Sequence, residues 1–127
     1  ASEGATTLER NPAGAEGIYV STPFSGVNAR PETRRFIDEY LARFGHPPKH
    51  DAALAYDATS AAVAALRAVG NDRAAVQRYL RNLDSTTAPT GATGKIYFDS
   101  LGDRRSMRGV VFQVRDGRAV AVSDTTS

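Results

Sequence analysis

The run VVFQVRDGRAVAV, residues 110–122, gives the clearest local signal in this sequence. Two β-branched runs, 110–115 and 118–122, flank the pair Asp116 and Gly117. An Asp-Gly pair between strand-like runs favours a two-residue turn, because both turn positions need positive φ and these residues tolerate it. The sequence therefore predicts an antiparallel β-hairpin over residues 110–122.

Two more strands are predicted upstream of this hairpin. Residues 17–22, GIYVST, are β-branched and aromatic and are closed by Pro23, and residues 95–98, KIYF, form a second such run. Residues 99–103 indicate a turn rather than a calcium loop, because the closing bidentate glutamate is absent. The strand at 17–22 has no neighbouring strand in sequence, so we expect it to need a sheet partner from outside this segment.

Three helices are predicted between these strands. The first begins at Pro31, which suits a first helical position, and stops at Gly45. Its apolar residues recur at spacings of three and four: Phe36, Ile37, Tyr40, Leu41 and Phe44.

The second helix runs from about residue 52 to residue 69, with Asp51 as its expected N-cap and Gly70 as its stop. It is dominated by alanine, and its small side chains predict burial on more than one side. The third helix is capped by Asn71 or Asp72. It carries one apolar face: Val76, Tyr79, Leu80 and Leu83.

The predicted order is strand, helix, helix, helix, strand, β-hairpin, which indicates an α/β layered unit. The chain has 127 residues, 41% hydrophobic and 24% charged, values that suit one modest globular unit. Residues 1–16 are rich in Gly, Ala, Thr and Asn and are predicted to be loop or linker, and residues 123–127 a tail.

Composition excludes several classes of function. The formal net charge is +2, but arginine and lysine never run longer than a pair, so a nucleic-acid-binding stripe is not expected. The absence of cysteine excludes disulfides, thiolate zinc sites and a cysteine nucleophile. No apolar run approaches the roughly 20 residues that cross a bilayer.

No motif indicates an enzyme, a metal or a cofactor. His46 and His50 have zinc-ligand spacing, but Pro47 and Pro48 between them argue against the helix that such a pair requires. The glycine-rich run 91–94 lacks the lysine and hydroxyl residue of a phosphate loop, and is expected to be a bend before a strand. No serine lies in a nucleophile-elbow context. We therefore predict no catalytic residues, no metal site and no cofactor.

The pair Tyr56 and Asp57 is the one polar feature of the second helix that invites a functional interpretation. It either faces a cleft or has a purely structural role. In the second case Tyr56 packs with its hydroxyl at the edge of the core, and Asp57 is stabilised by the helix dipole.

Four segments, taken in order, resemble one known family. They are residues 14–24 (GAEGIYVSTPF), 36–48 (FIDEYLARFGHPP), 53–58 (ALAYDA) and 91–103 (GATGKIYFDSLGD). They are similar to the C-terminal portion of type I periplasmic solute-binding proteins, which serve branched-chain amino acid ABC transporters. The likeness spans roughly residues 14–122.

The resemblance implies a partial type I fold, in which two Rossmann-like lobes hold a small solute in the cleft between them. It implies a strand of the second lobe, a hinge near residues 22–25, helices over 31–83 that complete the first lobe, and return strands over 95–122. It offers Phe24, Ala53, Tyr56 and Asp57 as ligand contacts. The implied solute is an amino acid or a similar small acid or amide, and the implied partner is a membrane permease.

Three functions remain open at this point. The chain belongs to the solute-binding component of an ABC importer, to the ligand-sensing ectodomain of a receptor or kinase with the same fold, or to a stand-alone α/β protein-interaction module. The first two imply a periplasmic or extracellular location, with a lipoprotein anchor as one option. Open sheet edges also permit a homodimer.

Overall fold

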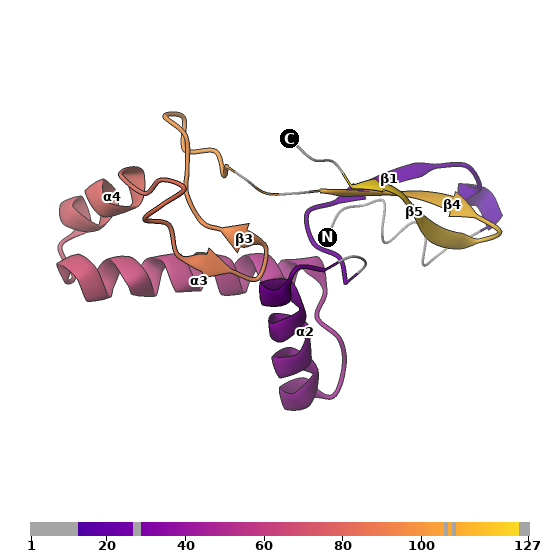
Figure 1. Cartoon of the computed structure of the whole chain (residues 1–127), viewed down its shortest axis with the longest axis horizontal. Coiled ribbons are helices and arrows are strands. Elements are labelled where there is room, and N and C mark those ends of the chain that lie inside the picture. Colours follow the sequence, from indigo (N-terminus) through magenta and orange to yellow (C-terminus); the bar gives the residue numbers. More distant parts are fainter. Residues whose placement is uncertain (1–12, 27–28, 106, 108, 125–127) are drawn as a thin grey trace.

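A computed structural model describes residues 13–26, 29–105, 107 and 109–124 of the chain. The helices and strands form two groups along the long axis of the molecule (Figure 1). In chain order they are η1 Ala13–Ala15, β1 Tyr19–Thr22, α2 Pro31–Phe44, α3 His50–Val69, α4 Arg73–Arg81, β2 Thr90–Gly91, β3 Gly94–Lys95, β4 Val110–Arg115 and β5 Arg118–Asp124.

The predicted C-terminal hairpin is confirmed. Strands β4 and β5 pair antiparallel, and Asp116 and Gly117 form the turn with φ of 52° and 69°. Positive φ at both positions gives the two-residue turn whose twist matches that of the flanking strands. Strand β5 continues to Asp124, two residues beyond the predicted end at residue 122.

The strand at the N-terminal side finds its partner inside this chain, so the expectation of an outside partner was wrong. Strand β1 pairs antiparallel with β4, from Tyr19 opposite Gln113 to Thr22 opposite Val110. The sheet order is β1-β4-β5. A pairing between opposite ends of a chain leaves no local turn signal, and so the sequence could not reveal it.

Helix α2 has the bounds that its sequence predicts. Pro31 occupies its first turn, and Gly45 ends it with φ 75°, donating its N–H to the Leu41 carbonyl at 2.8 Å. Glycine suits this left-handed position because it has no Cβ. Helix α4 settles the open choice of cap, since the Asp72 carboxylate accepts from the Ala75 N–H at 2.6 Å.

Helix α3 differs from its prediction in two respects. It begins at His50, so that Asp51 lies in the first turn and not at the N-cap. Its buried residues form a single stripe: Ala53, Asp57, Ala61 and Ala65. Val63 and Leu66 are exposed on the other side of the helix, so burial on more than one side was wrong for this chain.

The strand predicted over residues 95–98 was also mostly wrong. Strand β3 contains only Gly94 and Lys95, which pair with β2 in a tight two-stranded ribbon. The apolar run continues beyond it, but the Asp99 turn folds the chain back at once and leaves one isolated bridge between Phe98 and Arg104. The predicted turn over 99–103 is confirmed: Asp99 accepts the N–H groups of Leu101 and Asp103, both at 2.9 Å.

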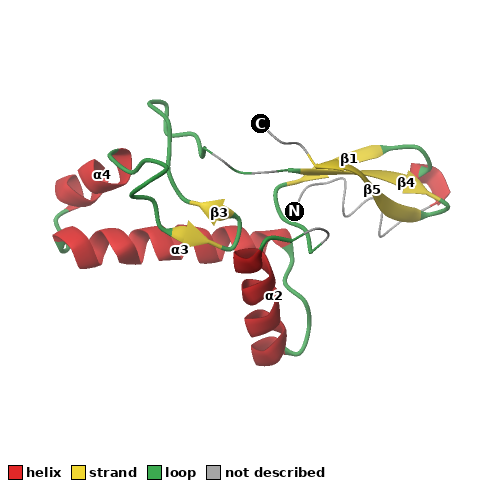
Figure 2. Ribbon diagram, in the orientation of Figure 1, coloured by secondary structure: helices red, strands yellow, loops and turns green. Residues whose placement is uncertain are grey.

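The elements gather at two ends of the molecule (Figure 2). Helices α2, α3 and α4 lie with the β2–β3 ribbon at one end, which we call the helical part, and the β1-β4-β5 sheet lies at the other. The chain passes between the two ends twice, once between Thr22 and Pro31 and again between Arg105 and Val110 (Figure 1). Within the described residues, no helix is both long and apolar enough to cross a membrane.

Candidate functional site

The first passage meets the helical part at Phe24. This side chain is 9% exposed and packs edge-on against Phe36 of α2, with ring centroids 5.9 Å apart and an interplanar angle of 82°. Ala53 of α3 and Ala92 of the β2–β3 turn complete the same buried cluster. The small side chains of Ala53 and Ala92 allow the backbones of α3 and the turn to approach the ring closely. The junction therefore brings together two of the predicted site residues, Phe24 and Ala53.

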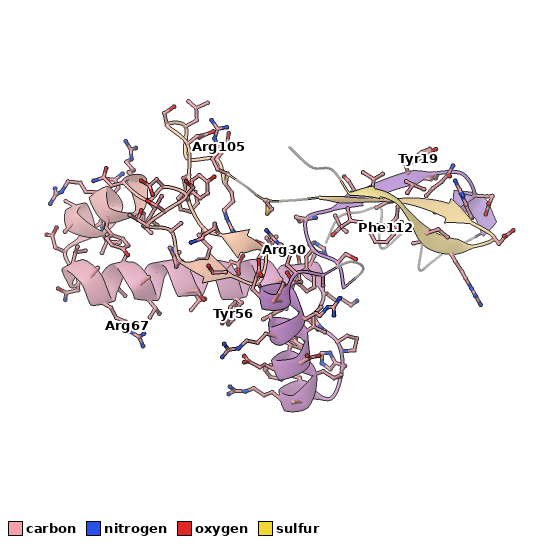
Figure 3. All side chains as sticks on the ribbon, viewed as in Figure 1. Tyr19, Arg30, Tyr56, Arg67, Arg105 and Phe112 are labelled. Atoms are coloured by element: carbon pink, nitrogen blue, oxygen red, sulfur yellow. The ribbon has the colours of Figure 1, made fainter. Side chains whose placement is uncertain are left out.

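Tyr56 of α3 also packs against Phe36. Its ring centroid is 4.9 Å from that of Phe36, and the side chain remains 47% exposed. In Figure 3 it lies below α3, on the other side of α2 from the sheet. It lines a hollow of about 460 Å³ between α2 and α3, whose walls also include Tyr40, Phe44 and Thr59.

Asp57 points away from this hollow and into the β2–β3 turn. It is 1% exposed, and its Oδ1 accepts the Ala92 N–H at 2.5 Å. Its Oδ2 accepts the Thr93 N–H at 3.1 Å and the Thr93 hydroxyl at 2.5 Å. Both terminal nitrogens of Arg104 also lie 3.3 Å from Oδ2. Within the chain, Asp57 is thus fully occupied in holding the turn.

Three further side chains bind the backbone carbonyls of the same turn. The Thr33 hydroxyl donates to the Ala92 carbonyl at 2.8 Å, and Arg30 Nη2 donates to the Thr93 carbonyl at 2.7 Å. Arg104 Nη2 donates to the Lys95 carbonyl at 3.1 Å. None of these three residues was predicted from the sequence to belong to the site. The one signal that pointed here was a carboxylate, Asp57, on an otherwise apolar helix.

A charged pair lies on the surface of α2, and one of its members, Glu39, also lines the α2–α3 hollow. Arg35 Nε donates to Glu39 at 2.7 Å, and this hydrogen bond, together with the charge of Glu39, raises the pKa of Arg35. Both side chains are largely exposed, so the pair contributes little to stability.

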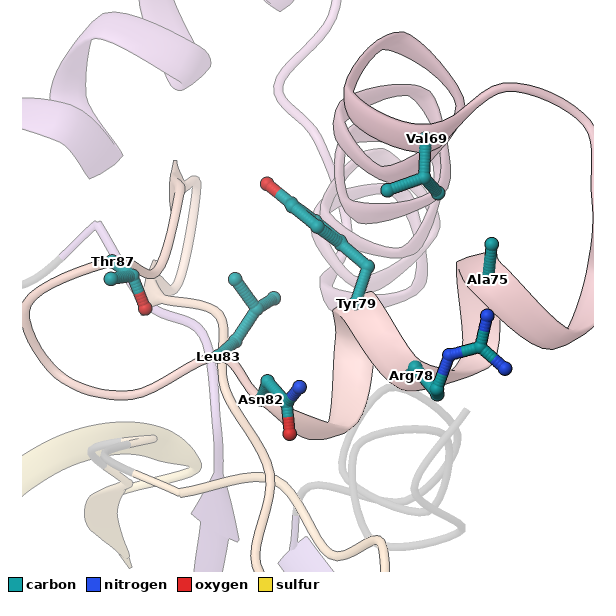
Figure 4. Close-up of a pocket in the computed structure, with 7 residues that line it drawn as sticks. All are labelled: Val69, Ala75, Arg78, Tyr79, Asn82, Leu83 and Thr87. Carbon is teal, nitrogen blue, oxygen red and sulfur yellow. The ribbon is translucent and has the colours of Figure 1, made fainter.

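A second hollow lies at the far end of α3, away from the junction. It has a volume of about 410 Å³ and is lined by Val69, Ala75, Arg78, Tyr79, Asn82, Leu83 and Thr87. Figure 4 shows the Tyr79 ring reaching across it toward α3, while Arg78 lies at its edge. Among the described residues no group of three His, Cys, Asp or Glu side chains is placed to hold a metal ion.

The sequence profile of one family, the periplasmic binding proteins, matches residues 2–119. The chain belongs to this family, and its fold is a partial type I periplasmic binding protein fold. No curated protein matches the chain closely enough to count as a relative.

Several solved structures share this fold. The leucine-binding protein LivK from Thermotoga maritima is 26% identical, with a TM-score of 0.77 over 94% of this chain and 33% of its own. An ABC transporter substrate-binding protein from Desulfitobacterium hafniense, in complex with leucine, is 28% identical with a TM-score of 0.73, over 96% of this chain and 34% of its own. The isoleucine complex of LivJ from Streptococcus pneumoniae, at 21% identity and a TM-score of 0.76 over 96% of this chain and 34% of its own, supports the fold alone. This chain spans about a third of the length of these proteins.

Proposed function

We propose that this chain is part of the solute-binding component of an ABC importer, and that it helps to hold a small amino acid or a similar acid or amide. Family membership supports the general role. The leucine named for the similar Desulfitobacterium hafniense protein supports the class of solute.

The observation that carries the proposal is the junction at Phe24. The chain passes twice between the sheet and the helical part, and the first passage is packed against α2 and α3 just where it enters the helical part. Two bodies joined by short passages are the arrangement that closes around a ligand by hinge motion. A solute held between them lies against the junction.

The site residues have different roles in this proposal. Phe24 forms the wall of the cleft at the junction, and Ala53, which is 0% exposed, packs directly behind it. Tyr56 supports this wall through its contact with Phe36 while keeping an exposed edge of its own. Asp57 contributes through the turn that it holds against Ala53 and Phe24. The hinge itself lies near residues 22–25, where the Thr22 hydroxyl donates to the Phe24 carbonyl at 3.1 Å.

Transport is favoured over sensing because the similar Desulfitobacterium hafniense protein is a substrate-binding protein of an ABC transporter. The corresponding partner is a membrane permease, which binds the closed form, and the corresponding location is periplasmic or extracellular. Among the residues that the structure describes, β1 and β5 form the two edges of the β1-β4-β5 sheet and pair with no further strand, and either edge offers a surface for a homodimer.

A thermal melt of the full-length protein with a panel of branched-chain amino acids, amides and aromatic acids tests the proposal. A ligand at 100 times its dissociation constant stabilises the folded state by about 2.7 kcal/mol, which raises the melting temperature by a few degrees. One class of solute is expected to give this shift. A melting temperature that none of the solutes changes contradicts the proposal.

A further inference from the structure

We propose that Arg30 and Arg104 are positioning residues that fix the sheet relative to the helical part, because each holds one passage of the chain to the same turn, residues 92–95. The inference rests on the proposed function in one respect, since the two bodies that it orients are the two sides of the proposed cleft. Neither arginine is assigned a contact with solute.

Arg30 anchors the first passage. It is the last residue before α2, and its Nη2 donates to the Thr93 carbonyl at 2.7 Å. Glu32 lies 3.2 Å from Arg30 Nε and holds the guanidinium in this orientation. The first passage therefore enters the helical part through a charge-assisted hydrogen bond to the turn.

Arg104 anchors the second passage. It lies where the chain leaves the Asp99 turn, and its side chain is 15% exposed. Its Nη2 donates to the Lys95 carbonyl at 3.1 Å and approaches the Gly94 carbonyl at 3.4 Å, while both terminal nitrogens bind Asp57. A planar guanidinium can bind a carboxylate and carbonyls together, whereas an ammonium is a single point charge.

Two glycines, Gly91 and Gly94, leave room for the side chains that bind this turn. A Cβ on Gly94, whose φ is 106°, would collide with the Arg30 guanidinium, and a Cβ on Gly91 would lie 2.5 Å from Cγ of Asp57. Both positions therefore require glycine. The Asp57 carboxylate accepts hydrogen bonds from the amide groups of the turn, and the two arginines donate to the carbonyl groups of the turn. Two positively charged side chains therefore bind one backbone segment, with a negatively charged carboxylate beside it.

This arrangement restricts how the two bodies can move. A body held by one flexible passage can swing about any axis. When two passages are both fixed at neighbouring points on one rigid turn, the remaining freedom is mainly rotation about the line through those points. We infer that Arg30 and Arg104 together restrict the motion of the sheet relative to the helical part to rotation about a single axis.

Spin labels test this inference without any solute. The 127-residue sequence contains no cysteine that would take up a label unintentionally. Arg67→Cys on α3 and Arg118→Cys on β5 therefore place one label on each body, both at exposed positions. The distance distribution between the labels is measured by pulsed electron paramagnetic resonance in the full-length protein. Arg30→Gln and Arg104→Gln are each expected to broaden it. The matched control, Arg105→Gln, removes a neighbouring arginine that is 63% exposed and is expected to leave the width unchanged.

The same variants then separate this inference from the proposed function. If a solute binds the unsubstituted protein, Arg104→Gln is expected to weaken the affinity about tenfold through lost orientation, and Arg104→Lys to restore only part of it. If no solute binds, the proposed function fails while the label widths still decide this inference. Should Arg104→Gln fail to fold, the less buried Arg30 decides instead. Unchanged widths in a folded Arg30→Gln or Arg104→Gln protein overturn the inference.

Discussion

Replacing Asp57 by alanine tests whether the turn at residues 92–95 depends on this one carboxylate. The substitution removes the acceptor of four sets of donors: the amide of Ala92, the amide and the hydroxyl of Thr93, and the guanidinium of Arg104. All of these contacts converge on a side chain that is 1% exposed, so water has little initial access to replace them.

The expected cost follows from these contacts. A buried donor left without an acceptor costs about 1–3 kcal/mol, and breaking a buried charged pair by removing one partner costs about 3–5 kcal/mol. Water that enters the space left by the carboxylate offsets part of the sum. We therefore expect Asp57→Ala to destabilise the fold by about 4 kcal/mol, and Asp57→Asn, which keeps the shape and one acceptor oxygen, by about 2 kcal/mol.

Urea unfolding of the full-length protein measures this change, and hydrogen exchange at the amides of Ala92 and Thr93 locates it. The control is Asp38→Asn on the exposed face of α2, which is expected to change the unfolding free energy by less than about 0.5 kcal/mol. A cost for Asp57→Ala below about 1 kcal/mol, with exchange at both amides unchanged, refutes the reasoning.

Three further predictions follow from single contacts. Gly91→Ala places a methyl group against Asp57 and is expected to cost about 1–3 kcal/mol in the same urea unfolding, so a neutral effect contradicts the close approach. Asp72→Ala removes the hydrogen bond to the Ala75 amide and is expected to cost about 1 kcal/mol, seen as faster hydrogen exchange in the first turn of α4, whereas Asp72→Asn retains most of the cap. The hydroxyls and amides of Thr86 and Thr87 donate hydrogen bonds to the Asp84 carboxylate. These bonds hold the pKa of Asp84 well below its ordinary value. Its folded-state pKa is depressed, so its stabilisation is complete above about pH 4 and is lost as the pH falls through the folded-state value. An Asp84→Asn protein is expected to show a shallower loss of stability over that acidic range.

Much of the fold was accessible from the sequence because its signals are local. Gly45 and Gly70 end their helices, and Asp116 with Gly117 forms the hairpin turn, because each signal acts within a few residues of the structure that it specifies. The length of β3 was not accessible in this way. The run at 95–98 has strand-forming residues, but a strand needs a partner, and the Asp99 turn removes it after Lys95.

The candidate site was only partly accessible, for a physical reason. Phe24, Ala53, Tyr56 and Asp57 were chosen by resemblance, and the structure gathers them around Phe36 and the 92–95 turn. The roles of Arg30 and Arg104 depend on contacts between residues far apart in sequence. Charged residues at such positions look like ordinary surface residues until the fold is known, and no spacing rule connects them to Asp57.

Alanine methyl groups give the most direct test of the central claim, that solute is held against the junction of Phe24 and Ala53. The full-length protein is labelled with ¹³C at its alanine methyl groups and titrated with the solute that raises its melting temperature most. We expect the Ala53 methyl resonance to shift on binding, while that of Ala75, in the distant hollow by α4, remains in place. Binding that leaves the Ala53 resonance unmoved, or that shifts only Ala75, contradicts the claim.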